Sequence, residues 1–495
     1  MIPEEIAALC GTLRMPAASL EDLRAEQPAF DLVPYAEALR RGCLALRASD
    51  GAVSVVLGAP YDLDTQDWLE EQLRLPFRYR LASPLDVAAY LGEQEAQLRA
   101  LDGFSAIALS EDRKADGAQE ISFASASEAD STVVRLVTST LYDALKAGAS
   151  DVHLESTGTG LAIKYRIDGV LTAADTMPGA ELAEQVISRI KVMSELDIAE
   201  RRVPQDGRFQ ARRDGRDIDF RVSVMPSVYG EDAVLRILDR KALSDQLQGL
   251  TLDALGFSPE MKQSLRSLSA QPHGMLLATG PTGSGKTTTL YALISETNNG
   301  RDKFITIEDP VEYHLPGVLQ IPVNEQKGLS FARGLRSILR HDPDRIMVGE
   351  IRDPETAEIA VQSALTGHLV YTTVHANNAL DVLARFMHMG LDTYNVVSAM
   401  NAVLAQRLVR VLCKSCSGKG CQSCRNTGYR GRKALGELLV LNDELRELIV
   451  SRAPARKLKE AARAAGSVPL REAALRLAES GETTLEEIDR VTFVA

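Results

Sequence analysis

The most chemically informative segment of the chain runs from Gly280 to Thr287 and reads Gly-Pro-Thr-Gly-Ser-Gly-Lys-Thr. It matches the phosphate-loop pattern G-x-x-x-x-G-K-[ST] at every fixed position. Glycines let backbone N–H groups turn toward phosphate oxygens, because no Cβ stands in the way. In this pattern the lysine reaches the β- and γ-phosphates and the last hydroxyl binds Mg²⁺. The sequence therefore predicts a site for a magnesium-bound triphosphate, formed by Gly280, Pro281, Thr282, Gly283, Ser284, Gly285, Lys286, Thr287 and Thr288.

The segments around the loop are those that its pattern requires. An apolar run at 275–279 precedes the loop and predicts a buried strand, and residues 288–296 predict a helix. The N-terminus of that helix adds partial positive charge beside the phosphates. Three more apolar runs, at 304–307, 346–348 and 369–373, alternate with helical segments, which predicts a parallel sheet with helices on both faces. Ligands of such sheets bind at the carboxyl ends of the strands.

Acidic residues follow two of these strands. Glu350 comes after the run at 346–348, and we expect it to position Mg²⁺ or an attacking water. Glu308 and Asp309 come at the end of the run at 304–307. Burying neighbouring carboxylates is unfavourable unless they face a cation or solvent. A magnesium ion that activates a water nucleophile would be such a cation. The alternative for each is a surface carboxylate at a strand end.

Histidines flank the run at 369–373. We expect His375, at the carboxyl end of the run, to contact the γ-phosphate region. His368, at the other end, is equally consistent with a packed or surface residue.

Four arginines also suit phosphate recognition, because the planar guanidinium group can bind two oxygens at once. Arg336 and Arg340 are one helical turn apart and can face the same partner. In a ring of subunits such groups could stabilise charge on a neighbour's γ-phosphate. Solvated surface arginine is the alternative for all four, which are Arg208, Arg221, Arg336 and Arg340.

Four of the six cysteines form two C-x-x-C pairs, Cys413 with Cys416 and Cys421 with Cys424. In a reducing compartment such a cluster indicates a metal site rather than disulfides. Four thiolates can surround Zn²⁺ tetrahedrally and leave no position open for catalysis, so a structural zinc site is predicted. The four-residue gap between the pairs is shorter than the usual ribbon spacing.

The composition is that of an ordinary soluble globular protein, with 495 residues, 45% hydrophobic and 25% charged. The formal net charge of −12 disfavours non-specific nucleic-acid binding, which depends on neutralising phosphates. The first ten residues carry two glutamates and no basic segment, so no secretory signal is expected. The uncharged stretch at 359–380 contains too many polar side chains to cross a bilayer cheaply. We therefore expect a cytosolic chain whose membrane contact goes through a partner.

The chain is long enough for several domains. Residues 43–47 and 53–57 predict a hairpin around Asp50-Gly51 in a small mixed α/β unit, and Ser83-Pro84 predicts a helix start. The Ser-, Ala- and acid-rich stretch near 110–130 predicts a linker. The predicted organisation is an N-terminal partner-docking domain at 1–110, a linker at 111–130, a second α/β domain at 131–243, an ATPase core at 244–410, a cysteine loop at 411–430 and a helical C-terminal region at 431–495.

Several motifs together resemble those of bacterial type II secretion and type IV pilus assembly ATPases. Residues 339–353, Leu-Arg-His-Asp-Pro-Asp-Arg-Ile-Met-Val-Gly-Glu-Ile-Arg-Asp, are similar to the signature of that family. Residues 307–313 resemble its Asp box, and residues 366–377 resemble its His box. The likeness runs from about Val133 to Ala495 and also includes the segments at 149–155, 166–170 and 221–226.

The resemblance implies a hexameric ATPase at the cytoplasmic face of the bacterial inner membrane. The implied fold is a RecA-like P-loop NTPase domain preceded by a PAS-like α/β domain and a small N-terminal domain, with a zinc-binding insert and a helical C-terminal region. Residues 1–110 would dock on the cytoplasmic domain of an inner-membrane secretion or pilus platform protein. By position, Lys286 and Thr287 would bind ATP and Mg²⁺, Glu350 would activate water, Glu308 and Asp309 would support the metal, His375 would sense the γ-phosphate, and Arg208 and Arg221 would act as arginine fingers.

Three other functions are compatible with these motifs. The first is extension of a type IV pilus instead of assembly of a secretion pseudopilus. The second is a scaffold that binds ATP without hydrolysing it, which the presence of Glu350 disfavours. The third is a DNA-translocating ring, which the acidic net charge disfavours.

Overall fold

The computed structural model of the chain describes residues 4–13, 15–48, 51–73, 75–95, 131–213, 215–239 and 250–492. The chain divides into two compact units, residues 1–239 and residues 240–495. The predicted linker at 111–130 lies outside the described residues.

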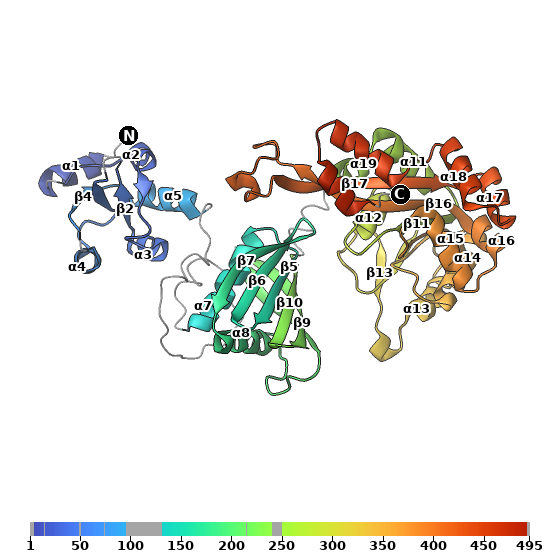
Figure 1. The fold of residues 1–495 in the computed structure, drawn as a ribbon, viewed down its shortest axis with the longest axis horizontal. Coiled ribbons are helices and arrows are strands. Elements are labelled where there is room, and N and C mark those ends of the chain that lie inside the picture. The colour runs from blue at the N-terminus through green and yellow to red at the C-terminus, as the bar shows by residue number, and fades with distance from the viewer. Residues whose placement is uncertain are drawn as a thin grey trace. The chain divides into compact units, whose positions relative to one another are not determined.

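The N-terminal part contains a small four-stranded sheet with the strand order β1-β2-β3-β4 (Figure 1). Strands β2 and β3 pair antiparallel, which confirms the hairpin predicted from the sequence, and β4 adds to β3 in parallel. Helix α5 begins at Pro84, as predicted. The elements are α1 (Glu4–Leu13), α2 (Leu20–Ala25), β1 (Gln27–Pro28), α3 (Tyr35–Arg41), β2 (Cys43–Arg47), β3 (Val53–Leu57), α4 (Leu63–Gln72), β4 (Phe77–Leu81) and α5 (Pro84–Glu95).

A second sheet follows, with six antiparallel strands in the order β7-β6-β5-β10-β9-β8. Its elements are α7 (Thr132–Lys146), β5 (Asp151–Thr157), β6 (Gly160–Ile167), β7 (Val170–Pro178), α8 (Ala180–Met193), β8 (Gln205–Arg213), β9 (Arg216–Ser227) and β10 (Gly230–Leu238). Residues of α7 and α8 share one buried cluster with alternate residues of β9, such as Phe220 and Val222. The intervening residues of β9 are exposed or half-buried, so the helices cover only one face of this sheet.

The C-terminal unit is built on a seven-stranded sheet with the order β13-β12-β14-β15-β11-β16-β17. Every neighbouring pair is parallel except β16 with β17. The predicted parallel sheet is therefore present. Its strands are β11 (Gly274–Thr279), β12 (Phe304–Glu308), β13 (Leu319–Pro322), β14 (Arg345–Val348), β15 (Leu369–Val374), β16 (Met400–Leu412) and β17 (Tyr429–Val440).

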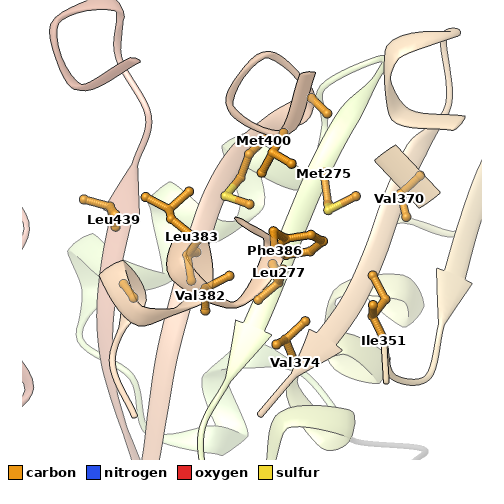
Figure 2. Packing of buried hydrophobic residues seen from close by; sticks show 14 of the residues in the cluster. Met275, Leu277, Ile351, Val370, Val374, Val382, Leu383, Phe386, Met400 and Leu439 are labelled. Atoms are coloured by element: carbon orange, nitrogen blue, oxygen red, sulfur yellow. The ribbon is translucent and has the colours of Figure 1, made fainter. Parts of the chain in front are cut away.

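Helices pack on both faces of this sheet, because alternate residues of each central strand point to opposite sides. Met275 and Leu277 of β11 belong to one buried cluster (Figure 2), whereas Leu276 and Ala278 belong to another. The first cluster includes residues of α13 (Phe331–Ile338), α14 (Pro354–Leu365), α15 (Ala379–His388) and α16 (Thr393–Ala399), and the second includes residues of α10 (Leu252–Leu255), α11 (Pro259–Ser269) and α12 (Lys286–Thr297).

The region after residue 430 differs in part from the prediction of a helical C-terminal region. Residues up to Val440 belong to β17, which pairs with the long strand β16 from Ala402 to Leu412. The helices begin only at Asp443 and are α17 (Asp443–Val450), α18 (Ala455–Ala464), α19 (Leu470–Glu479) and α20 (Leu485–Val491). Neither β16 nor β17 was predicted. Strand β17 begins with exposed basic residues instead of an apolar stretch.

Candidate functional site

The phosphate loop connects the end of β11 to the start of α12, as its sequence predicts. Gly280, Gly283 and Gly285 have φ angles of 146°, 75° and 83°, which side-chain-bearing residues rarely adopt. A Cβ on Gly280 would lie 2.4 Å from the carbonyl oxygen of Gln406. Glycine at this position therefore allows β16 to lie directly against the loop.

Lys286 is buried inside the loop. Its ammonium donates to the carbonyl oxygens of Gly280 and Pro281, at 2.9 and 3.0 Å. Burial lowers the pKa of Lys286, the negative charge of Glu350 opposes that shift, and the positive charge of Arg407 adds to it. A buried ammonium beside neutral carbonyls is a place where an anion is stabilised.

The residues of the loop fit a phosphate group. The Ser284 hydroxyl is buried and has no hydrogen-bond partner among the residues that the structure describes. The first N–H groups of α12 have no partner within the helix, and its dipole adds positive charge at the same end. Thr287, in the first turn, is half-buried, so its hydroxyl can serve as an oxygen ligand for Mg²⁺.

Gln406 supports the loop from β16, although the sequence analysis did not identify it. Its amide accepts a hydrogen bond from the Thr289 hydroxyl at 2.8 Å and donates to the Ser284 carbonyl at 2.9 Å. Both partners are more than 100 residues away in the chain, at separations of 117 and 122 residues. No local pattern could have revealed this contact.

The carboxyl ends of β14 and β15 bring Glu350 and His375 together. His375 Nε2 lies 3.7 Å from Glu350 Oε2, and Arg352 forms an ion pair with Glu350. Burial and the positive charge of Lys286 lower the pKa of His375, with Glu350 opposing them. The imidazole is therefore mainly neutral at pH 7 and can donate one hydrogen bond and accept another.

Asp309 and Glu308 point to different surroundings. Asp309 Oδ2 lies 3.5 Å from Arg352 Nη1, so Arg352 links the carboxylates of Asp309 and Glu350. Glu308 is 2% exposed, and its oxygens accept hydrogen bonds from Tyr291, Thr306 and Gln320. Its negative charge and the burial of the phenol raise the pKa of Tyr291.

The Glu308 contacts connect α12 to the edge of the sheet. Tyr291 belongs to α12, and Gln320 belongs to β13. Gln320 also donates to the Tyr313 carbonyl at 2.9 Å, and the Tyr313 hydroxyl lies 3.4 Å from the Thr288 hydroxyl. Glu308 therefore holds the end of β12, which Asp309 follows. Of these two acidic residues, only Asp309 lies beside Arg352.

Three of the other predicted residues lie away from this cluster. His368 precedes β15, at the opposite end of the strand from His375, and contacts the Ser363 carbonyl at 3.0 Å. Arg336 on α13 forms an ion pair with Glu355, at 2.5 Å. Arg340 Nη1 donates to the Arg336 carbonyl at 2.8 Å and so caps the end of its own helix.

Arg208 and Arg221 belong to the other unit of the chain. They are directly opposite each other on β8 and β9, and both are exposed. Like charges placed opposite each other in a sheet repel, so this pair is suited to an anion that both groups contact.

The four cysteine sulfurs gather at the tip of the β16–β17 hairpin. All lie within 4.8 Å of one another, and the three closest pairs are 3.7 to 3.8 Å apart. A tetrahedron with Zn–S bonds of about 2.3 Å has S···S edges of about 3.8 Å. The cluster Cys413, Cys416, Cys421 and Cys424 therefore fits one zinc ion despite the short gap between the pairs.

The two cysteine pairs have matching backbone conformations. Residues just after the second cysteine of each pair have positive φ, Ser417 and Gly418 in one and Arg425 and Asn426 in the other. The Cys421 N–H also donates to Cys424 Sγ at 3.2 Å. Each pair thus turns its two sulfurs toward the same point.

Comparison with known proteins assigns the family. Residues 126–490 match the family described as type II/IV secretion system protein, and residues 13–101 match the MshEN domain. The chain belongs to the type II/IV secretion system protein family. One relative, type II secretion system protein HxcR of Pseudomonas aeruginosa, is 46% identical over 77% of this chain and 82% of its own length. Another, type II secretion system ATPase E of Vibrio cholerae, is 44% identical over 74% of this chain and 76% of its own length.

A solved structure supports the fold of this secretion-family chain. The Legionella pneumophila ATPase DotB superposes with a TM-score of 0.55 at 22% identity, over 72% of this chain and 95% of DotB. The family match and the curated relatives confirm the family expected from the sequence motifs. In the part of the chain that the structure describes, no helix is both long and apolar enough to span a membrane.

The cysteine cluster of this secretion-family chain makes a direct prediction. Replacing Cys413 with Ser is expected to reduce the zinc content from about one ion per chain to near zero, because a serine hydroxyl does not replace a thiolate ligand. Elemental analysis of the purified full-length protein measures this. Cys10→Ser, at a half-buried cysteine outside the cluster, serves as the control and should keep its zinc. Full zinc occupancy in the Cys413 variant would contradict the assignment.

Proposed function

We propose that the chain is the ATPase of a type II secretion system, which hydrolyses ATP to ADP and phosphate to power pseudopilus assembly and protein export. The main support is one edge of the C-terminal sheet, where the Lys286 loop, Glu350 and His375 come together. The relatives named as type II secretion proteins support the choice of a secretion machine over a pilus machine.

The proposed reaction gives each group of the site a separate role. Lys286 and the N-terminus of α12 hold the phosphates, and Mg²⁺, bound through Thr287 with support from Asp309, would neutralise charge on them. Glu350 orients a water for attack on the γ-phosphate. His375, mainly neutral and beside Glu350, senses the γ-phosphate by hydrogen bonding. Glu308 supports the metal side of the site indirectly, through the strand end that it holds.

Two further parts of the proposal concern assembly. Arg208 and Arg221 act as arginine fingers on ATP when the second domain approaches a nucleotide site within a homo-hexamer. Residues 1–110 dock on the cytoplasmic domain of an inner-membrane platform protein, so the ring works as a peripheral protein at the cytoplasmic face. Their support is the exposed arginine pair and the family to which the chain belongs.

The test of ATP binding is Lys286→Ala. A hydrogen bond to a charged group contributes about 1.5–3 kcal/mol, so the Kd for Mg²⁺-ATP is expected to rise about 10- to 100-fold. Fluorescent-nucleotide titration measures the Kd, and phosphate release by the same samples measures turnover. Lys327→Ala removes an exposed lysine of the same unit and should change neither value.

The test of the cellular role uses the same two variants in the native bacterium. Lys286→Ala is expected to leave exported enzymes in the periplasm, and Lys327→Ala to restore their export. Normal export together with loss of surface pili in the Lys286 variant would replace the secretion proposal with the pilus alternative. Wild-type turnover by the Lys286 variant would overturn the ATP site itself.

A further inference from the structure

Arg407 lies on β16 and is 7% exposed. Its guanidinium donates to two carbonyl oxygens, that of Gln406 at 2.9 Å and that of Asn377 at 2.8 Å. Its Nη1 also lies against the phosphate loop, 3.1 Å from the position of a Cβ on Gly280. The guanidinium therefore contacts the segment that follows β15 while lying beside the loop that follows β11.

The surroundings of Arg407 are unusual for a buried charge. Within the described residues, no carboxylate lies within ion-pair distance of its guanidinium, and burial lowers its pKa with only partial compensation from Glu437. Glu437 is itself half-buried and accepts a hydrogen bond from the Leu470 N–H at 3.2 Å. A buried charge without a counter-ion is destabilising. The guanidinium of Arg407 also makes two hydrogen bonds at once, which the single ammonium of a lysine cannot reproduce.

The segment that Arg407 contacts contains His375. We define residues 375–377 as the His375 loop. At the start of this loop, the Thr279 hydroxyl accepts from the Ala376 N–H at 2.9 Å and donates to the Val374 carbonyl at 2.8 Å. At the end of the loop, Arg407 holds the Asn377 carbonyl. The His375 loop is thus fastened at both ends to elements that border the phosphate loop.

We propose that Arg407 is a positioning residue that fixes the His375 loop relative to the phosphate loop, so that His375 stays in register with the γ-phosphate bound there. The proposal rests on the ATPase function proposed above and adds a residue that acts through His375. Displacing a reacting group by about 1 Å lowers the rate up to 100-fold. A shift of the His375 loop should therefore lower kcat.

The kinetic test uses Arg407→Lys, which keeps the positive charge but cannot span both carbonyls. In the full-length protein, kcat is expected to fall about 10- to 100-fold, with KM for ATP changing less than about threefold because the charge is kept. His375→Ala should also lower kcat, and the double variant should fall no further than the lower single variant.

The matched control is Arg410→Lys. Arg410 lies on the same strand, but its guanidinium is bonded to Glu487 away from the loop. If Arg410 and His375 act independently, the fold-change in kcat of the Arg410→Lys, His375→Ala double variant equals the product of the two single fold-changes. The proposal would be overturned if Arg407→Lys kept the wild-type kcat. It would also be overturned if the fold-changes of Arg407→Lys and His375→Ala multiplied in the double variant.

A titration separates this proposal from the ATPase proposal, because it needs no turnover. The charged groups that act on His375 are Lys286, Glu350, Arg352 and Arg385. If Arg407 holds the loop, Arg407→Lys lets His375 move away from Lys286, and the pKa of His375 rises. Nuclear magnetic resonance of the full-length protein measures it, with the His375 signal assigned by His375→Ala. An unchanged His375 pKa would overturn the proposal even if the wild-type protein proved unable to hydrolyse ATP.

Discussion

Replacing Glu350 with Gln is expected to lower kcat for ATP hydrolysis about 10²- to 10⁴-fold, the range of a general base, while ATP still binds. Glutamine has the same length and can still hydrogen-bond to Arg352, but it cannot take a proton from water. Phosphate release gives the rate, and fluorescent-nucleotide titration gives the affinity. The expected combination is a nearly unchanged Kd with a greatly reduced kcat.

The variant should also change the charges around it in a defined direction. Glu350 raises the pKa values of Lys286 and His375, so its neutralisation lowers both. The control is Glu355→Gln, which removes a carboxylate of α14 that pairs with Arg336 at the surface. It should hydrolyse ATP at the wild-type rate. A Glu350→Gln protein that matched this control would remove Glu350 from the mechanism.

Replacing Arg208 and Arg221 together with Ala is expected to lower kcat about 10³-fold, at the lower end of the range for arginine fingers. Their positions opposite each other on β8 and β9 would allow both proposed arginine fingers to contact one phosphate group. A group that stabilises only the charge that develops during transfer changes the Kd for ATP little. Arg212→Ala, on the same strand with its guanidinium bonded to Asp217, is the control and should retain activity.

Mixing two inactive proteins tests whether these arginines act between subunits. The Lys286→Ala protein keeps the arginines but binds ATP poorly, and the Arg208/Arg221 variant keeps the ATP site. Mixed oligomers of the two proteins should recover phosphate release if the arginines of one subunit act on the ATP of its neighbour. Recovery would be absent if they act within one chain, and a double variant with wild-type kcat would exclude them from the reaction.

Much of the nucleotide site could be predicted because its parts are local in the sequence. The glycine pattern at 280–287 sets its own backbone conformation, and Glu350 and His375 each follow directly after a buried apolar strand. Parallel strands place such residues at one edge of the sheet. The four strands predicted around the site are all present as β11, β12, β14 and β15.

The predictions failed or stayed incomplete where the strand pattern was weak. Strands β5, β7 and β8 were not predicted, because one face of their sheet is left uncovered by the helices and their sequences are largely polar. The same holds for the basic start of β17. The burial of Glu308 was also invisible, since its hydrogen-bond partner Gln320 belongs to the edge strand β13.

The phosphate loop, the carboxylate and histidine that follow the neighbouring strands, and the four clustered cysteines could be recognised in the sequence, because each depends on residues a few positions apart. Which side chains support them depends on the folded chain. Gln406 and Arg407 reach the loop because β16 pairs with β11, and this strand order depends on packing both faces of the sheet. Hydrogen bonds across more than 100 residues exist only after that packing has formed.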